Sequence, residues 1–148
     1  MENSEKVSKI KLIFAEDIMT EEVVVVNQKM TIGQVAHLML RERVSGYPVV
    51  DDAGKVSGII TLTDLFVLID QMAHKKSELP DRIADCKKRP ISDIMSKDVM
   101  SISPKTPLDE IIHSVVEKKI HTFPVMDNDK LVGIIGRHDV LNATFVYG

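Results

Sequence analysis

The residues best suited to chemistry lie in one short stretch that occurs twice, as Gly58-Ile59-Ile60-Thr61-Leu62-Thr63-Asp64 and as Gly133-Ile134-Ile135-Gly136-Arg137-His138-Asp139. In each copy a glycine opens a short β-branched run, and polar residues then lead into an apolar helical pattern. This order predicts a strand, a sharp turn and the N-terminus of a helix. Unpartnered backbone N–H groups and the positive end of the helix dipole make such a turn a natural seat for an anion such as phosphate. The aspartate, itself an anion, needs a separate explanation.

A helix cap or a metal site would also account for these residue types. Thr61 and Asp64 have the spacing of a cap in which a hydroxyl and a carboxylate serve the N–H groups of the first turn. His138-Asp139 resembles the His-Asp dipeptide of metal-dependent phosphohydrolases, but no further His and Asp ligands follow at a fixed spacing. We therefore expect no metal site. The recurrence of aspartate at 139 after a glycine favours a ligand role in at least one copy.

The repeat extends over most of the chain. The motif Asp17-Ile18-Met19 returns at an offset of 76 residues, from 17 to 93. The same offset pairs His37 with His113 and Pro48 with Pro124, and it becomes 75 after a turn that is one residue shorter, from 58 to 133. The chain is therefore predicted to contain two copies of one unit.

Each copy is predicted to run β-α-β-β-α. In the first copy, Val23–Val26 reads as a strand covered on both faces, and Thr31 with Gln34 can cap an amphipathic helix. Residues 51–54 suit a hairpin turn between two strands. The predicted fold class is α/β (α+β), with two repeats packed in approximate two-fold symmetry and a short helix before them. The expected divisions are 1–16 (helical arm), 17–76 (first repeat), 77–89 (connector, with one helical turn around 81–86) and 90–148 (second repeat).

Length and composition exclude several classes of protein. The chain has 148 residues, 44% of them hydrophobic, which is enough for a real core. No apolar run approaches the ~20 residues that span a bilayer, and no secretory signal is evident, so we expect a cytoplasmic protein without membrane contact. A net charge of −3 with interspersed signs argues against nucleic acid. Cys86, the single cysteine, reads as an incidental thiol.

Apolar residues on the last helix of each copy exceed what one small core needs. They are predicted to form a homodimer surface, and they are Phe66, Ile69, Met72, Val140, Leu141 and Phe145. His37 and His113 recur between apolar neighbours of equivalent helices. We interpret them as partly buried or interface histidines rather than as ligands.

The combined pattern resembles the cystathionine-β-synthase (CBS) domain in its tandem form, the Bateman module. The resemblance covers about residues 17–141 and rests on two copies of three motifs in one order. Besides the two stretches above, these are Asp-Ile-Met at the start of each copy, and Ser45-Gly46-Tyr47-Pro48 with Thr122-Phe123-Pro124. It implies a regulatory module without catalytic activity or catalytic cofactor, which binds AMP, ADP or ATP, or in some members S-adenosylmethionine.

The resemblance also implies two ligand clefts at the seam between the repeats. In such families the aspartate accepts hydrogen bonds from ribose hydroxyls, and neighbouring hydroxyl groups contact phosphate. The first cleft would use Thr61, Thr63 and Asp64 with Met100, His121, Thr122 and Pro124. The second would use Gly136, Arg137, His138 and Asp139 with Thr20, Val24, Val44, Ser45 and Pro48. Gly136 departs from the pattern, because it lacks the hydroxyl of Thr61, and Arg137 and His138 could supply cationic donors instead.

Two classes of function follow from the sequence. In the first, the chain senses an adenosine nucleotide and acts on an effector protein that we expect to be a separate polypeptide. In the second, the clefts are empty and the chain serves only to dimerise or to hold a partner. Loss of nucleotide binding on changing Asp64 or Asp139 would distinguish the first from the second.

Overall fold

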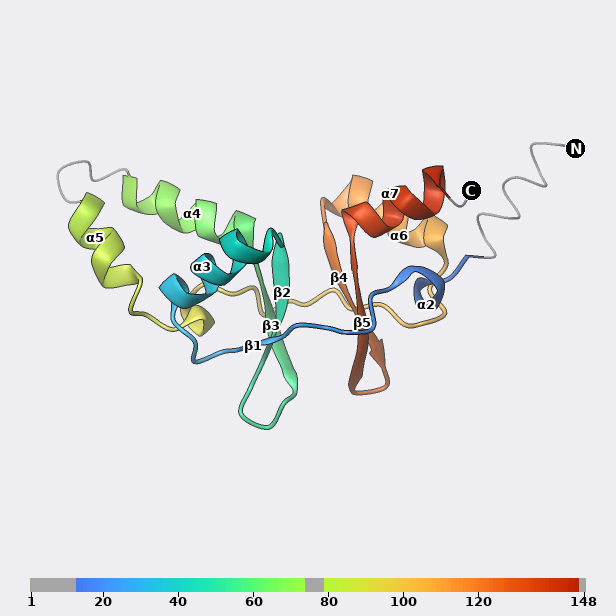
Figure 1. Cartoon of the computed structure of the whole chain (residues 1–148), viewed down its shortest axis with the longest axis horizontal. Helices are drawn as coiled ribbons and strands as arrows, with labels where there is room; N and C mark the ends of the chain where they lie inside the picture. Colours follow the sequence, from blue (N-terminus) through green and yellow to red (C-terminus); the bar gives the residue numbers. More distant parts are fainter. Residues whose placement is uncertain (1–12, 74–78, 147–148) are drawn as a thin grey trace, which may run out of the picture. The chain divides into compact units, whose positions relative to one another are not determined.

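The structure is a computed structural model that describes residues 13–73 and 79–146, without the side chains of residues 79 and 80. Its contacts divide the chain into two compact units, each of which is described by itself. One is Val24–Val99, called the 24–99 unit; the other combines Met1–Val23 with Met100–Gly148 and is called the 100–148 unit. In each unit, helices pack on a small sheet, which is a mixed α+β architecture (Figure 1). The helix expected before the repeats falls mainly in residues 1–12, outside the described residues.

The 24–99 unit is built on a three-stranded sheet. Strand β2 (Gly46–Val50) lies in the middle, parallel to β1 (Val26–Asn27) and antiparallel to β3 (Val56–Thr61). The β2–β3 turn is the hairpin that the sequence predicts. Asp51 Oδ1 accepts hydrogen bonds from the N–H groups of Ala53 and Lys55, and Gly54 adopts a φ of 81°, which glycine allows without strain. The helices of this unit are α3 (Ile32–Glu42), α4 (Leu62–Ala73), α5 (Leu79–Cys86) and the 3-10 turn η2 (Ile91–Asp93).

The 100–148 unit repeats this topology. Strands β4 (Thr122–Asp127) and β5 (Lys130–Gly136) form an antiparallel pair, and Ile102 bridges Val125 in parallel, as Val26 pairs with Val49. Its helices are α2 (Ala15–Ile18), α6 (Leu108–Lys118) and α7 (Arg137–Phe145). The predicted order β-α-β-β-α is therefore present in both units, with a bridge instead of a full first strand in the second.

The start of each sequence repeat packs in the unit formed mainly by the other repeat. Met95 and Ser96 lie against Gly58, and the backbones of Ile59 and Ser96 exchange two hydrogen bonds of 2.9 Å. In the 100–148 unit, Met19 lies against Gly133, and Thr20 bonds to Ile134 in the same way. The compact units thus differ from the expected divisions 17–76 and 90–148, because the segments before Val24 and before Met100 are exchanged.

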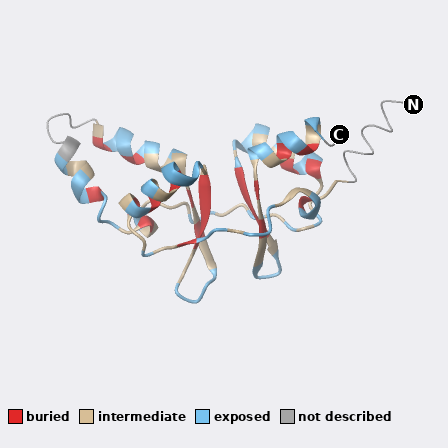
Figure 2. Cartoon of the chain, in the orientation of Figure 1, coloured by how far each residue is buried: buried red, intermediate tan, exposed pale blue. Residues whose placement is uncertain are grey.

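Each unit encloses its own apolar core between the helices and the sheet. Figure 2 shows the buried residues concentrated on β2 and β4 and on the sheet-facing sides of the helices. The fully buried side chains of the 24–99 unit include Val35, Met39, Tyr47, Val49, Ile60 and Ile91. Those of the 100–148 unit include Ala15, Leu108, Ile111, Phe123, Val125 and Ile135.

The strand expected at Val23–Val26 is wrong for most of its length. Only Val26 and Asn27 pair with β2, while Val24 and Val25 are 49% and 39% exposed. The β-branched run resembles a buried strand, but the chain leaves the sheet of the 24–99 unit before Val26 and belongs to the other unit up to Val23. A short ladder therefore replaces the predicted strand.

The predictions of a helix cap and of a short connector helix are confirmed, whereas the burial predicted for two histidines on helix faces is wrong. The Thr31–Gln34 cap is confirmed, because each side chain bonds to the backbone N–H of the other. A helix around residues 81–86 is confirmed as α5. His37 and His113 are exposed, so their expected partial burial is wrong. Each lies on the solvent side of its helix.

Candidate functional site

In the 24–99 unit, the strand-turn-helix centres on Thr61 and Asp64. The Thr61 backbone N–H donates to Asp64 Oδ2 at 2.8 Å, and the Thr61 hydroxyl oxygen lies 3.1 Å from the same atom. The Asp64 N–H in turn reaches Thr61 Oγ1 at 3.4 Å. The helix cap that the sequence allowed is therefore present. It occupies only Oδ2, and Oδ1 has no hydrogen-bond partner among the described residues.

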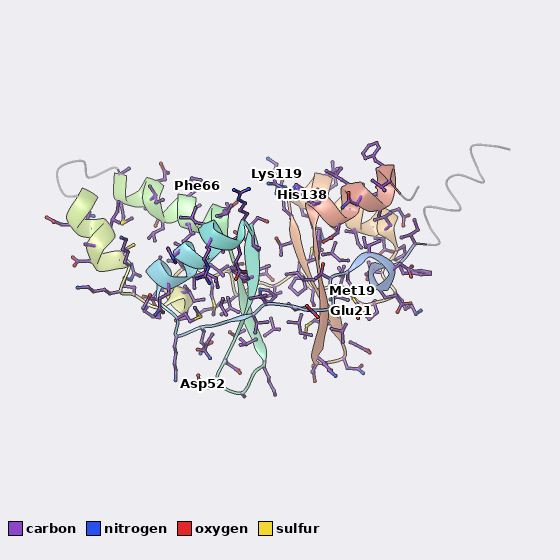
Figure 3. All side chains as sticks on the ribbon, viewed as in Figure 1. Met19, Glu21, Asp52, Phe66, Lys119 and His138 are labelled. Carbon is purple, nitrogen blue, oxygen red and sulfur yellow. The ribbon has the colours of Figure 1, made fainter. Side chains whose placement is uncertain are left out.

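The equivalent turn of the 100–148 unit is simpler. Gly136 N–H donates to Asp139 Oδ2 at 2.7 Å, and there is no hydroxyl to add a second bond. Arg137 and His138, both exposed, form the first turn of α7, where Figure 3 labels His138. The Arg137 cation at the helix N-terminus opposes the helix dipole, so it does not stabilise the helix itself. Arg137 makes no ion pair with any described residue, which leaves it available to an external anion.

Asp64 is half-buried, and its burial raises the pKa of the carboxyl above the usual value, against the opposing effect of the hydrogen bonds from Thr61. A carboxylate in this position gains from any further donor that replaces lost water. Thr63, one residue earlier, is exposed on the first turn of α4. The turn therefore combines an acceptor short of donors with an accessible hydroxyl.

A cavity lies next to each aspartate, within the same unit. One, of about 250 Å³, is lined by Asp64, Val67, Leu68 and Gln71 of α4 and by Asp93 and Ile94. The other, of about 360 Å³, is lined by Asp139, Asn142 and Ala143 of α7 and by Asp17, Ile18 and Met19. Five of the six positions in each lining are equivalent in the repeat register, the exceptions being Gln71 and Met19. Each cavity has two carboxylates in its wall, which disfavours a phosphate there.

Several more of the predicted site residues lie at the same ends of the sheets. Ser45 accepts a hydrogen bond from the N–H of Leu62 through its carbonyl oxygen (2.9 Å), so the segment Val44–Ser45 lies beside the Thr61 turn. In the 100–148 unit, Thr122 pairs with Gly136 in the sheet, and Thr20 pairs with Ile134 just before that turn.

The exposure of these residues differs. His121 and Thr20 are exposed, whereas Pro48, Thr122 and Pro124 are buried in their strands. Met100 is partly buried and Val24 is exposed. Each predicted cleft takes residues from both units, so its assembly stays a prediction.

Sequence reasoning missed four positions that the repeat register pairs with predicted site residues. Ser96 is equivalent to Thr20, since both bridge the strand that leads to the turn, Ile120 to Val44, Gly46 to Thr122 and Leu62 to Arg137. The offset of 76 residues, or 75 after the shorter turn, would have found all four when applied to every predicted site residue. Among the described residues, no group of three His, Cys, Asp or Glu side chains could hold a metal ion.

No helix in the described part of the chain has the length and apolar character to cross a membrane.

The family model described as "CBS domain" matches the chain twice, over residues 15–71 and 91–145. The chain is also similar to known proteins over most of its length. It is 27% identical to an inosine-5'-monophosphate dehydrogenase of Methanocaldococcus jannaschii, over 86% of this chain and 23% of that protein. Three of the curated relatives are longer proteins, of which the chain spans between 23% and 59%.

Two solved structures show the same fold. One, titled as CBSX2 in complex with AMP, is 26% identical, with a TM-score of 0.73 over 90% of this chain and 97% of that one; CBSX2 is a chloroplastic protein of Arabidopsis thaliana. The other, from Methanocaldococcus jannaschii, is titled a putative archaeal homologue of γ-AMPK. It is 27% identical, with a TM-score of 0.81 over 95% of this chain and 51% of that one. With two family matches in one chain and these neighbours, the protein belongs to the CBS-domain family as a tandem pair.

Proposed function

We propose that the chain is a regulatory module that binds an adenosine nucleotide, AMP, ADP or ATP, and changes what an effector protein encounters. The observation that carries the proposal is the repeated aspartate turn. Asp64 and Asp139 each hold one carboxylate oxygen on the backbone and leave Oδ1 without a partner among the described residues. A ribose diol offers two hydroxyl donors to such an acceptor.

The phosphate groups would lie at the first turns of α4 and α7. Thr61 and Thr63 offer neutral hydroxyl groups at one turn, and Arg137 and His138 offer cationic donors at the other. Positive helix ends favour an anion at both. The AMP complex of the similar CBSX2 structure supports an adenosine ligand for this chain as well. S-adenosylmethionine, which lacks phosphate, remains the alternative ligand.

The test is calorimetry with AMP, ADP, ATP and S-adenosylmethionine on protein stripped of carried-over ligand. At least one nucleotide should bind saturably, and the double variant Asp64→Asn, Asp139→Asn should lose that binding. Asparagine retains an acceptor for the cap, so the variant should fold. Asp129→Asn is the matched control, because Asp129 is an exposed aspartate in the β4–β5 turn. Unchanged binding in the double variant would refute the ribose assignment.

Binding should also stabilise the fold. At ligand one hundred times its dissociation constant, mass action adds about 2.7 kcal/mol. For a chain of this length the melting temperature should rise by roughly 5 to 10 °C. If no adenosine compound shifts it, the sensing function gives way to the scaffold function.

The scaffold function and the homodimer have a specific observation in their favour. Phe66 on α4 and Phe145 on α7 are 68% and 80% exposed, and Ile69 and Leu141 are exposed beside them (Phe66 is labelled in Figure 3). Met72 and Val140, predicted for the same surface, are instead buried in the cores. Closed pairing of two chains would cover the exposed residues. Sedimentation showing only monomer at micromolar concentration, with and without nucleotide, would count against a homodimer. A cytoplasmic location stays a prediction.

A further inference from the structure

An apolar groove of about 460 Å³ lies between α3, α4 and α5 of the 24–99 unit, the three helices that Figure 1 shows on one side of its sheet. The side chains at its floor are buried in the core, and they are Ile32, Leu68, Met72 and Cys86. At its rim, Leu40, Phe66 and Ile69 are 75%, 68% and 45% exposed. Thr61 and Asp64 lie outside this lining. The groove therefore has the size and apolar character of a small-molecule site and is distinct from the aspartate turn.

Two small residues of α3 open the groove. Gly33 and Ala36 are three positions apart, so they share the helix face that lines it. The second repeat has Asp109 and Ile112 at these positions, both with larger side chains. The groove therefore depends on residues of the first repeat that the second repeat does not share.

The charged groups of the lining are of one kind. Two basic side chains, His37 of α3 and Lys87 at the end of α5, line the groove and are exposed at its mouth, and the described lining contains no carboxylate. Neither basic side chain has an ion pair or a hydrogen bond with any described residue. The cavities beside Asp64 and Asp139, by contrast, each have two carboxylates in the wall. An anion with an apolar body therefore complements this groove and neither of the other two cavities.

We propose that the groove binds an amphipathic carboxylate of the fatty-acid class. The hydrocarbon chain lies along the apolar floor, and the carboxylate accepts hydrogen bonds from Lys87 Nζ and from the His37 ring at the mouth. A second copy of the chain would bring the same two basic side chains on this face and would supply no counter-charge. A fatty acid supplies both the apolar chain and the charge. This site goes beyond the proposed nucleotide function and does not depend on it.

Calorimetry of the full chain with octanoate, decanoate and dodecanoate, each below its micelle concentration, tests the proposal. Binding should be saturable, and each added methylene should tighten it about fourfold until the groove is filled. Dodecyltrimethylammonium, which has the same chain and the opposite charge, should bind about tenfold more weakly than dodecanoate.

A variant that fills the groove tests the location of the chain. Ala36→Ile introduces the residue that the second repeat has at position 112, and it should weaken dodecanoate binding about tenfold or more because the groove is then overpacked. Ala84→Ile is the matched control, since Ala84 is an exposed residue of α5 that lies outside the lining, and it should leave binding unchanged. Circular dichroism of both variants without ligand shows that they are folded.

A second pair of variants tests the charge. Lys87→Gln should weaken dodecanoate binding about three- to fivefold, as expected for an exposed ion pair, whereas Lys88→Gln, at an exposed neighbour outside the lining, should not. The double variant Asp64→Asn, Asp139→Asn should bind dodecanoate as the wild type does, so failure of the nucleotide function would leave this result intact.

The proposal is overturned if none of the three carboxylates binds saturably, or if Ala36→Ile leaves their binding unchanged. It is also overturned if the cationic amphiphile binds as tightly as dodecanoate. Sedimentation in which Ala36→Ile converts a dimer to a monomer, without dodecanoate binding in the wild type, would assign the groove to a second copy. Binding to phosphatidylglycerol vesicles without binding of free dodecanoate would assign it to a lipid surface.

Discussion

The 24–99 unit and the 100–148 unit follow one backbone path but present different side chains at the turn before their last helix. Thr61 and Asp64 share three hydrogen bonds in the first, whereas Gly136 and Asp139 share one in the second. The backbone N–H to carboxylate bond is the part common to both. The aspartate and the preceding strand therefore define the turn, and the intervening residues are free to set the chemistry, neutral hydroxyls in one unit and cations in the other.

A second difference between the units lies in the atoms that pack against Gly58 of β3 and Gly133 of β5. At Gly58 an added Cβ would meet Met95 Sδ at 2.7 Å and the Ser96 carbonyl oxygen at 2.8 Å. At Gly133 the nearest atoms all belong to the Met19 side chain. A change of rotamer moves the Met19 Sδ and Cγ atoms aside and leaves its Cβ, 3.0 Å from the added atom, in place, whereas the Ser96 carbonyl is held by the bridge to Ile59.

The largest expected effect on stability comes from adding a methyl group at each of these two glycines. Gly58→Ala should lower the free energy of unfolding by about 2–3 kcal/mol, the cost of overpacking against a fixed backbone. Gly133→Ala should cost about 1 kcal/mol, since Met19 can change rotamer. Urea denaturation of both variants measures the difference. Equal losses of unfolding free energy in the two variants would show that the atoms packed against the two glycines are equally rigid.

The next effect concerns phosphate. If the proposed function holds, Arg137→Gln should weaken ATP binding about tenfold, as expected for a lost hydrogen bond to a charged group, and weaken AMP binding less. The reason is that Arg137 is the added cation that distinguishes the second turn from the first. Calorimetry with both nucleotides gives the ratio. An equal loss of affinity for AMP and ATP would mean that Arg137 contributes to nucleotide binding without distinguishing ligands by their phosphate charge.

A smaller effect on stability is expected when the hydroxyl is removed from the first cap or added to the second. Thr61→Ala should cost about 1 kcal/mol of stability, because Asp64 loses its hydroxyl partner and the turn loses a cap. Gly136→Thr should add a few tenths of a kcal/mol, since the backbone at Gly136 has a φ of −103° that threonine can adopt. Thermal unfolding of the two variants provides the measurement. A stabilising Thr61→Ala would contradict the cap.

The smallest effect is on pH dependence. The pKa of Asp64 is raised in the folded protein by burial, so its contribution to stability is present below the unfolded value of about 3.9 and is lost as pH rises through the folded pKa. Asp64→Asn removes this dependence. The stability of the variant relative to the wild type should therefore rise from pH 4 upward. A relative stability that falls over the same range would mean that the cap bonds outweigh burial.

Much of this fold follows from local patterns. The hairpin at Asp51–Gly54, the Thr31–Gln34 cap and the helix around 81–86 depend on neighbouring residues. The repeat transfers the hairpin to the second copy, between β4 and β5, but not the cap, because Pro107 stands at the position of Thr31 and makes no side-chain cap bond. The site turn could be predicted for the same reason. Its cap uses one oxygen of the carboxylate, and the proposed ligand role would use the other, although the sequence presented the two roles as alternatives.

The exchange of the repeat starts could not be predicted from the pattern. The register states that Met19 and Met95 are equivalent, and that Gly58 and Gly133 are equivalent, but either methionine fits either glycine by that rule. The same exchange explains the exposed Val24 and Val25, whose β-branched type suggested a buried strand. Which methionine packs against which glycine depends on long-range packing, and local residue types do not encode it.

The exchanged segments also determine when each part of the protein can be completed during synthesis. The 24–99 unit is continuous in the chain, so it has all of its residues once the ribosome has released Val99. The segment from Phe14 to Val23 emerges first but must wait for Pro107 and Ile134, its partners about a hundred residues later. Met19 is therefore without Gly133, against which it packs, until most of the chain has been made. A pause in translation between the two units would prolong this exposed state and favour mispairing of Met19 with Gly58.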